Sequence, residues 1–272
     1  MNKRMTARIS HYLLVVAVAA SVSLLSACFH DDDETAPVVV TPNGFYEGSA
    51  SVNQDTVVVN DLKGMVSGNR FMFVSASEVL LYDGTITAIN GTAYTATVTV
   101  YQHGDQLTTA TVTGTFRTGL SLSGTFTDTD TNISNGMGNG SFVLTYSLNN
   151  SASALARVAK EWYGVDANSR LNGALTDVNN MTISMTGQLS RDSDYQSDMP
   201  ALAGCALDPG GTVLPVAGIN VYTVSLTLSS CTNVSVSGSY TGFAATRTVA
   251  DDVLVIAFSN GLFSGSGVIT VN

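Results

Sequence analysis

Apolar and polar side chains alternate along most of the chain from Gly44 onward. Within residues 94–100 every second residue is apolar, and the residues between them are threonines. A period of two puts successive side chains on opposite faces of an extended strand, so one face can pack into a core while the other meets water. The same period recurs in three further segments of the first half: Ala110, Val112, Gly114 and Phe116; Leu120, Leu122, Gly124 and Phe126; and Phe142, Leu144, Tyr146 and Leu148. This pattern predicts antiparallel strands with one buried face.

Short turn signals separate these segments at intervals of about ten residues. They are Ser67-Gly68-Asn69, Asp83-Gly84, Asn90-Gly91, His103-Gly104-Asp105 and Arg117-Thr118-Gly119. Short turns between successive strands make an antiparallel meander, and about eight strands fit within residues 44–149. A meander of that size can close into a small barrel, which removes exposed sheet edges. Gly114 and Gly124 suit the tight bends of a closing barrel.

Residues 151–162 have the spacing of a helix instead. Their apolar side chains fall at positions i, i+3, i+4 and i+7, which form a single stripe: Leu155, Val158, Ala159 and Trp162. Ser151 or Ser153 can cap the beginning of this helix, and Gly164 can end it. We expect the helix to pack against a barrel end or to bridge two domains, with a lid over a ligand as the alternative.

The strand pattern returns after the helix. Alternating apolar residues are Met181, Ile183 and Met185, and then Tyr222, Val224, Leu226 and Leu228. Residues 253–258 are apolar on both faces and therefore predict a central strand. A long polar loop, residues 191–209, contains Cys205.

The sequence thus predicts an all-β protein of two small antiparallel β domains joined by a short helix. We expect the first domain to be a meander barrel of roughly eight strands and the second to be a barrel or a sandwich. The expected boundaries are residues 44–149 for the first domain, 150–168 for the helical connector and 169–272 for the second domain.

The N-terminus has a different composition, which indicates export. Lys3, Arg4 and Arg8 give a positive start without an acidic residue, and a mostly apolar run follows at residues 12–25. A run of this length is too short to cross a hydrocarbon core of about 30 Å comfortably as a permanent helix. A charged start, a short apolar core and small residues at its end are typical of a secretory signal.

Leu25-Ser26-Ala27-Cys28, at the end of that run, resembles the lipobox of bacterial lipoproteins. The resemblance implies cleavage of residues 1–27 and acylation of Cys28, and several acyl chains anchor a protein firmly in a bilayer. Phe29 stands where an aspartate often marks inner-membrane retention in that family, so the resemblance implies the outer membrane, with either leaflet open. The alternative is an ordinary signal peptide with a chance cysteine.

Residues 28–43 predict a lipid-bearing tether. Asp31, Asp32, Asp33 and Glu34 repel one another and extend the chain, while Pro37 and Pro42 stiffen it. Fifteen such residues reach at most about 50 Å. We expect the acidic run to hold the folded part away from the membrane, with binding of a divalent cation as the alternative.

The charge of the mature chain argues against nucleic acid as a partner. The signal holds three of the 11 basic residues and none of the 21 acidic residues, so the mature chain carries 8 basic residues and a formal charge of −13. Such a chain is repelled by phosphate backbones and by anionic lipid surfaces. The sequence predicts one partner, the lipid bilayer, which the protein contacts through its acyl anchor. The identity of a protein or small-molecule partner is not predicted.

Cys205 and Cys231 remain after Cys28 is assigned to the lipid. In an oxidising compartment we expect them to pair, and closing a loop of about 27 residues contributes roughly 3.5 kcal/mol in the chain-entropy model. A reactive thiol pair is the alternative, although the C-x-x-C spacing is lacking. The pattern of Cys205, Asn220-x-Tyr222, Cys231 and Tyr240-x-Gly242 resembles one in β-rich lipoproteins of proteobacteria, and that resemblance implies no particular activity.

Candidate catalytic chemistry is sparse. The mature chain has two histidines, His30 in the tether and His103 in a predicted turn, and neither accompanies a nucleophile or zinc motif. Carboxylates for glycoside hydrolysis pair only in space, yet Glu47 and Glu78 are the only glutamates between the tether and the predicted helix. We therefore predict a protein without catalytic activity and without a cofactor.

Two acidic groups are weak candidates for calcium. Asp128, Asp130 and Asn132 begin like an EF-hand loop, but Ile133 replaces its glycine and Asn139 its bidentate glutamate. The second group lies in the long polar loop and comprises Asp192, Asp194 and Asp198. Solvated loop acids are the other interpretation of both groups.

Three functions fit these features. The first is a non-catalytic binding or structural role in the cell envelope, displayed from the outer membrane. The second is a lipocalin-like carrier of a small apolar ligand, which needs a partly empty barrel. Small inward residues at 96, 110, 114 and 124 leave room for a ligand, whereas Phe116, Phe126, Phe142 and Tyr146 fill it. The third is a surface-exposed receptor for a protein partner.

Overall fold

The computed structural model describes residues 41–53, 56–129, 136–163, 171–173, 180–191, 205–231 and 233–271. The expected signal, Cys28 and the tether up to residue 40 lie outside these ranges. Residues from Val40 onward form one compact unit. Within the described residues, no helix has the length and apolar character needed to cross a membrane.

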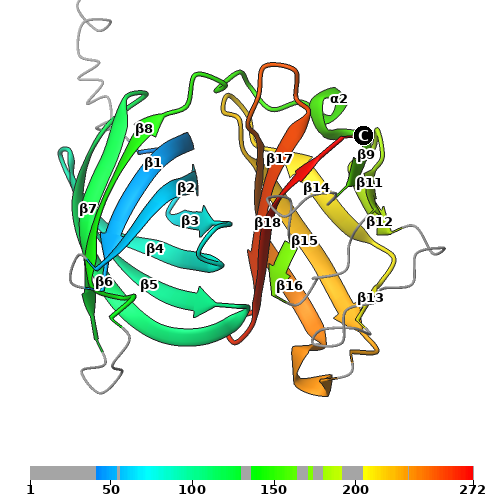
Figure 1. Cartoon of the computed structure of the whole chain (residues 1–272). Helices are drawn as coiled ribbons and strands as arrows, with labels where there is room; N and C mark the ends of the chain where they lie inside the picture. The colour runs from blue at the N-terminus through cyan, green and yellow to red at the C-terminus, as the bar shows by residue number, and fades with distance from the viewer. Residues whose placement is uncertain are drawn as a thin grey trace, which may run out of the picture. The chain divides into compact units, whose positions relative to one another are not determined.

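Eight antiparallel strands close into a barrel in the first half of the chain (Figure 1). The strands are β1 (Gly44–Val52), β2 (Val57–Ser67), β3 (Arg70–Ser75), β4 (Leu80–Asn90), β5 (Ala93–Gln102), β6 (Asp105–Arg117), β7 (Ser121–Asp128) and β8 (Gly140–Tyr146). Each strand pairs with the next, and β8 returns to pair with β1 along its whole length, from Tyr46↔Tyr146 to Val52↔Gly140. The predicted eight-stranded meander barrel is confirmed.

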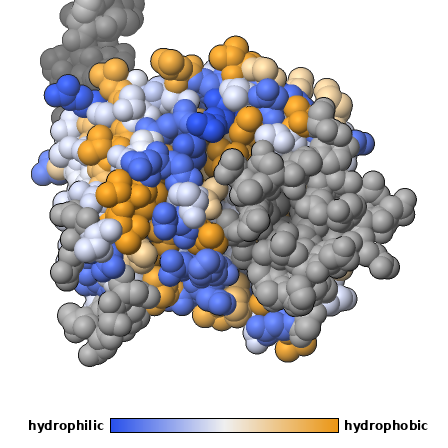
Figure 2. Space-filling view, viewed as in Figure 1, coloured by the Kyte–Doolittle hydropathy of each residue, from blue (hydrophilic) through white to orange (hydrophobic). Residues whose placement is uncertain are grey.

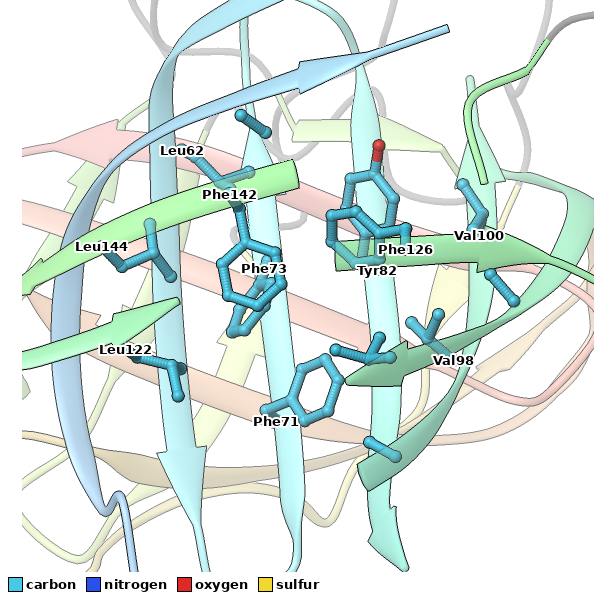
Figure 3. Close-up of a cluster of buried hydrophobic side chains, with 14 of the residues drawn as sticks. Leu62, Phe71, Phe73, Tyr82, Val98, Val100, Leu122, Phe126, Phe142 and Leu144 are labelled. Carbon is cyan, nitrogen blue, oxygen red and sulfur yellow. The ribbon is translucent and has the colours of Figure 1, made fainter. Parts of the chain in front are cut away.

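Aromatic rings fill the barrel interior (Figure 3). Phe73 lies between Phe71 and Phe142, with ring centroids 4.5 Å and 5.1 Å away. Phe126 stacks on Tyr82 at 4.6 Å and also contacts Phe142 at 4.9 Å. Such close offset and tilted pairs add stability beyond the burial of their surface. The interior is therefore a packed aromatic core.

Glycines on the strands make room for these rings. A Cβ on Gly84 would stand 2.0 Å from the ring of Phe71, and one on Gly114 would stand 2.7 Å from the ring of Tyr94. Gly114 and Gly124, predicted from the bends of a closing barrel, thus also serve the packing of its core.

Replacement of Gly84 by alanine is expected to cost about 1–3 kcal/mol of unfolding free energy, because the new methyl group overpacks the Phe71 ring. Chemical denaturation of G84A measures this loss. The control is the same substitution in a Phe71→Leu background, where the smaller side chain leaves space and the loss should shrink. An equal loss in both backgrounds would contradict the steric explanation.

Three apolar residues that follow the predicted alternation are exposed rather than buried. They are Leu120, Leu148 and Met185, at 61 %, 104 % and 66 % exposure. Leu120 precedes the first residue of β7 and Leu148 follows the last residue of β8, so neither belongs to a strand that would turn it inward. Figure 2 shows hydrophobic residues interspersed with hydrophilic ones over the described part of one face.

A second antiparallel sheet follows. Its strands are β9 (Glu161–Tyr163), β10 (Leu171–Gly173), β11 (Asn180–Ile183), β12 (Gln188–Arg191), β13 (Ala206–Leu207), β14 (Gly211–Pro215), β15 (Tyr222–Ser229), β16 (Gly238–Thr246), β17 (Val253–Ser259) and β18 (Ser264–Thr270), with a 3-10 turn η1 (Val234–Val236) between β15 and β16. The pairing Thr270↔Tyr163 brings β18 back to β9, so the sheet is nearly closed. The predicted central strand is confirmed, since β17 lies between β16 and β18 and is buried on both faces.

The predicted helix over 151–162 is wrong in extent. Only one turn, α2 (Leu155–Val158), is helical, and Trp162 lies in β9, where it pairs with Met181 of β11. The apolar stripe correctly predicted that Val158 and Trp162 are buried. Residues 161–163 form a strand instead of a helix because their backbone groups pair with the neighbouring strands of the second sheet. The Trp162 indole nitrogen donates to the Val158 carbonyl oxygen at 2.8 Å, which fixes the change from helix to strand.

Cys205 and Cys231 form the expected disulfide. It joins the chain just before β13 to the chain just after β15, two strands that also pair directly. Both cysteines belong to the core of the second sheet.

Candidate functional site

The barrel and the second sheet share a buried apolar interface. It is built from outward-facing side chains of both: Phe45, Met65, Met72, Val74, Leu81 and Tyr101 from the barrel, and Val221, Phe243, Ala245, Val255 and Ala257 from the second sheet. Both faces of β3 are therefore buried, one in the barrel core and one at this interface. The unbroken apolar run at residues 71–74 carried this signal, and our alternation analysis missed it.

A polar groove of about 570 Å³ lies where the barrel and the second sheet meet. Its lining comes from β3 to β6 on one side and from β16, β17 and the turn after β17 on the other. The lining residues are Arg70, Asp83, Thr85, Thr97, Val98, Thr99, Tyr101, Thr109, Ser239, Thr241, Ser259, Asn260 and Gly261. Its volume falls in the range of small-molecule sites, which often form where two structural units meet.

Arg70 and Asp83 supply the formal charges of the groove. Arg70 Nε donates to Asp83 Oδ1 at 2.9 Å and Arg70 Nη2 donates to Asp83 Oδ2 at 2.8 Å. Asp83 is paired with Met72, two residues from Arg70, so the two side chains meet diagonally across β3 and β4. The planar fork of arginine matches a carboxylate in this bidentate way, and the two charges neutralise each other.

The same guanidinium crosses to the second sheet. Arg70 Nη1 donates to Thr241 Oγ1 at 2.8 Å, and Arg70 Nη2 donates to the Thr241 carbonyl oxygen at 3.2 Å. Ser259 Oγ donates to Asp83 Oδ2, which ties the carboxylate to β17 as well. The guanidinium carbon stands 5.8 Å from the ring centroid of Phe243. The ion pair therefore builds the floor of the groove from both sheets.

Tyr101 adds a hydroxyl that stays protonated. Burial, with a further contribution from the nearby Asp83 charge, raises the pKa of Tyr101 to about 12. At neutral pH the phenol is thus an uncharged group.

Exposed threonines extend from the groove over the outside of the barrel. Thr85, Thr97, Thr111 and Thr127 are cross-strand neighbours on β4, β5, β6 and β7 and form one continuous row. Neighbouring rows contain Thr95, Thr113 and Thr125, and the half-buried Thr99 with Thr109. We call these nine residues the threonine face. Neighbouring strands are about 4.8 Å apart and alternate residues of one strand about 6.8 Å apart, while the hydroxyls of Thr113 and Thr125 approach to 3.1 Å.

Hydrogen bonds at two places hold the groove between fixed walls. At one place the turn between β5 and β6 meets the turn between β17 and β18: the Gln106 nitrogen donates to the Leu262 oxygen at 3.2 Å, and the Ser264 nitrogen donates to the Gly104 oxygen at 2.8 Å. At the other, Asn149 Nδ2, directly before the connector, donates to the Thr246 oxygen at 3.0 Å.

Arg157 of α2 strengthens the second of these places. Its Nη2 donates at 2.7 Å both to Asp251 Oδ1 and to Thr246 Oγ1. Burial by itself raises the pKa of Asp251, but the hydrogen bonds and the positive charge of Arg157 outweigh it and hold that pKa below its usual range. The carboxylate therefore remains charged and keeps the connector in place.

The sequence-predicted site residues lie elsewhere. Asp128 ends β7, where its Oδ1 accepts from Thr108 Oγ1 at 2.6 Å and its backbone nitrogen donates to Asn139 Oδ1 at 3.0 Å. The predicted lipidation site, Cys28, lies outside the described residues. So do the remaining calcium candidates, which are Asp130, Asn132, Asp192, Asp194 and Asp198. Where side chains are described, no three metal-ligating residues gather. His103 occupies the predicted turn and is exposed.

These observations define an all-β protein with a closed eight-stranded barrel, a nearly closed second sheet and a polar groove between them. No protein-family model matches the chain, and no curated protein sequence matches it. Two solved structures each align with 84 % of this chain and with 94 % of their own chain. One is Aeromonas veronii immune modulator A, at 15 % sequence identity and a TM-score of 0.34. The other is a Nostoc punctiforme protein of unknown function from the DUF3598 family, at 11 % sequence identity and a TM-score of 0.21. At these scores neither carries an argument about this chain.

Proposed function

We propose that this protein is a lipid-anchored protein of the bacterial outer membrane that binds a partner molecule in the polar groove, without catalysis. The observation that carries the binding role is the groove itself. It is concave, its floor is built from both sheets by Arg70 and Asp83, and hydrogen bonds fix its walls. A site whose walls are already in place loses little conformational entropy when a ligand enters.

The chemistry of the lining favours binding over catalysis. The Arg70 and Asp83 charges satisfy each other, and Tyr101 is held in its protonated form. General acid–base chemistry needs a group that titrates near the working pH, and a phenol with a pKa of about 12 is a poor candidate for that task.

The packed barrel interior argues against the lipocalin-like carrier. A barrel of eight strands is either filled by its side chains or just roomy enough for one ligand. Phe71, Phe73, Phe126 and Phe142 fill this one with stacked and tilted rings. Gly124, which we weighed as space for a ligand, lies against the ring of Phe142.

The outer-membrane location rests on the lipobox-like residues 25–28 and on the acidic tether. A protein held by such an anchor and tether would stand in an aqueous compartment, where a polar ligand is accessible. A protein partner would use more surface than the groove provides, because stable protein interfaces bury about 800 Å² on each side.

A thermal-shift experiment tests the binding role. A low-molecular-weight extract of the cell envelope should raise the Tm of the wild-type protein, because a ligand that binds only the folded state stabilises it. At a hundredfold excess over Kd the gain is about 2.7 kcal/mol, or roughly 5 to 10 °C for a protein of this size. Thr97→Trp blocks the groove and should abolish the rise.

The matched control is Thr145→Trp, which places the same bulk on an exposed position of β8 outside the groove lining. This variant should keep the full rise. The proposal fails if the extract shifts neither wild type nor control, or if Thr97→Trp responds like them. A wild-type Tm that falls after extraction with organic solvent would support the carrier instead.

A further inference from the structure

We propose that the ligand of the groove is a neutral glycan, and that a chain of several sugar units extends from the groove along the threonine face. This inference deepens the binding role proposed above and rests on it. It is argued from the charge of the groove, from the hydrogen-bonding groups of its lining and from the arrangement of the threonines.

The described lining of the groove offers a ligand no unpaired charge. Among these residues Arg70 and Asp83 are the only ionised side chains, and they are joined by two hydrogen bonds of 2.8–2.9 Å. An anionic ligand that binds Arg70 would have to separate it from Asp83, and a cationic ligand that binds Asp83 would have to separate it from Arg70. Either exchange leaves one partly buried charge without its partner, which is costly. A neutral ligand meets no such penalty.

Hydroxyl groups dominate the lining. They belong to Thr85, Thr97, Thr99, Tyr101, Thr109, Ser239, Thr241 and Ser259, beside the amide of Asn260. A hydroxyl both donates and accepts, so an array of hydroxyls matches a ligand that also presents groups able to do both. Sugars present such groups on every unit. An apolar ligand would remove these hydroxyls from water without replacing their hydrogen bonds.

The exposed lining positions are suited to contact. Thr85, Thr97, Thr109 and Ser239 are all exposed, and they come from four different strands. The γ-methyl group of each threonine lies beside its hydroxyl, so the same side chain can contact the C–H groups of a sugar ring while hydrogen-bonding its hydroxyls.

The threonine face gives the ligand a direction. The row that begins in the groove with Thr85 and Thr97 continues through Thr111 and Thr127, which lie outside the groove lining. Threonine side chains thus recur along this row on successive strands, which are about 4.8 Å apart. A linear glycan that leaves the groove meets a hydroxyl at each step, whereas a single sugar uses only the groove.

An extended peptide fits this surface less well. Peptides that join sheets do so by pairing with an open strand edge. The barrel strands that form the threonine face are each paired on both sides, because the barrel is closed. The groove and the face consist of side chains above those strands, so backbone pairing is not offered there.

An array of defined glycans tests the ligand class with the purified full-length protein. The array holds linear neutral oligomers of glucose, N-acetylglucosamine and galactose, of one to six units, beside sialylated, sulfated and phosphorylated chains. We expect binding to neutral oligomers that strengthens with length. The double variant Thr97→Val, Ser239→Ala removes two exposed hydroxyls of the groove with little change in shape and should weaken binding to the best oligomer by about tenfold.

The control variant Thr145→Val, Ser225→Ala makes the same changes at exposed strand positions outside the groove and should bind like wild type. Both variants are compared with wild type by Tm, so a folding defect is recognised. The glycan inference is overturned if binding is confined to anionic chains, if no glycan binds, or if the groove variant keeps full affinity. When one of these results accompanies an envelope-extract shift that Thr97→Trp abolishes, the binding role stands and only the ligand class is wrong.

Discussion

Replacement of Cys28 by alanine is expected to abolish labelling of the protein by radioactive palmitate and to move it from the membrane fraction to the soluble fraction. The physical reason is that acyl chains supply the membrane affinity. Each buried methylene contributes about 0.8 kcal/mol, and two anchoring chains already hold a protein stably. Within the described residues, no helix is long and apolar enough to span a membrane.

The control for this experiment is Ser23→Ala, which lies in the same apolar run of the signal but outside residues 25–28. It should leave both labelling and fractionation unchanged. Persistence of the palmitate label in the Cys28 variant, or membrane retention without it, would refute the lipoprotein assignment. The groove would be unaffected by that outcome, although its location in the cell would have to be argued anew.

Replacement of Trp162 by alanine should cost about 3–5 kcal/mol of unfolding free energy, because it empties a large, fully buried site. Trp162 packs in the core of the second sheet, and β9 is the strand that brings this sheet near closure. The loss is measured by chemical denaturation followed by far-UV circular dichroism, since Trp162 is the only tryptophan and fluorescence is lost with it.

Trp162→Phe is the matched variant. It keeps a ring in the core but removes the indole nitrogen that donates to the Val158 oxygen, so it should lose less than about 2 kcal/mol. A loss below about 1 kcal/mol in the alanine variant would show that the site collapses around the smaller side chain, contrary to tight packing.

Local patterns anticipated much of the barrel. Tyr94, Ala96, Val98 and Val100 point into the core as their period of two predicted, and four of the five predicted turns are turns. The prediction at Asp83-Gly84 is wrong: both residues lie within β4, because the chain turns earlier, at residues 76–79. The disulfide was anticipated from the two remaining cysteines of a chain that we expect to be exported. The other predictions succeeded because each depends on neighbouring residues or on a count, which one sequence provides.

The failures had a different cause. The stripe at residues 151–162 fits one helical face, yet Trp162 lies in a strand because β11 and β18 need a neighbour. Tertiary pairing overrode local periodicity. The groove was missed for a related reason: Arg70 and Asp83 are 13 residues apart and Thr241 is 171 residues from Arg70, so no local pattern joins them.

The sequence by itself determined which side chains face inward on the alternating strands, such as β5 to β8, and where most of the predicted turns lie. The export signal and the lipobox at the N-terminus stay predictions. Only the tertiary structure decided that the outer faces of barrel and second sheet pack together, and that Arg70, Asp83 and a row of threonines meet beside that interface. The physical reason is the range of the interactions. Side-chain alternation is imposed by the geometry of one strand, whereas strand register and sheet packing arise from contacts between residues far apart in the chain.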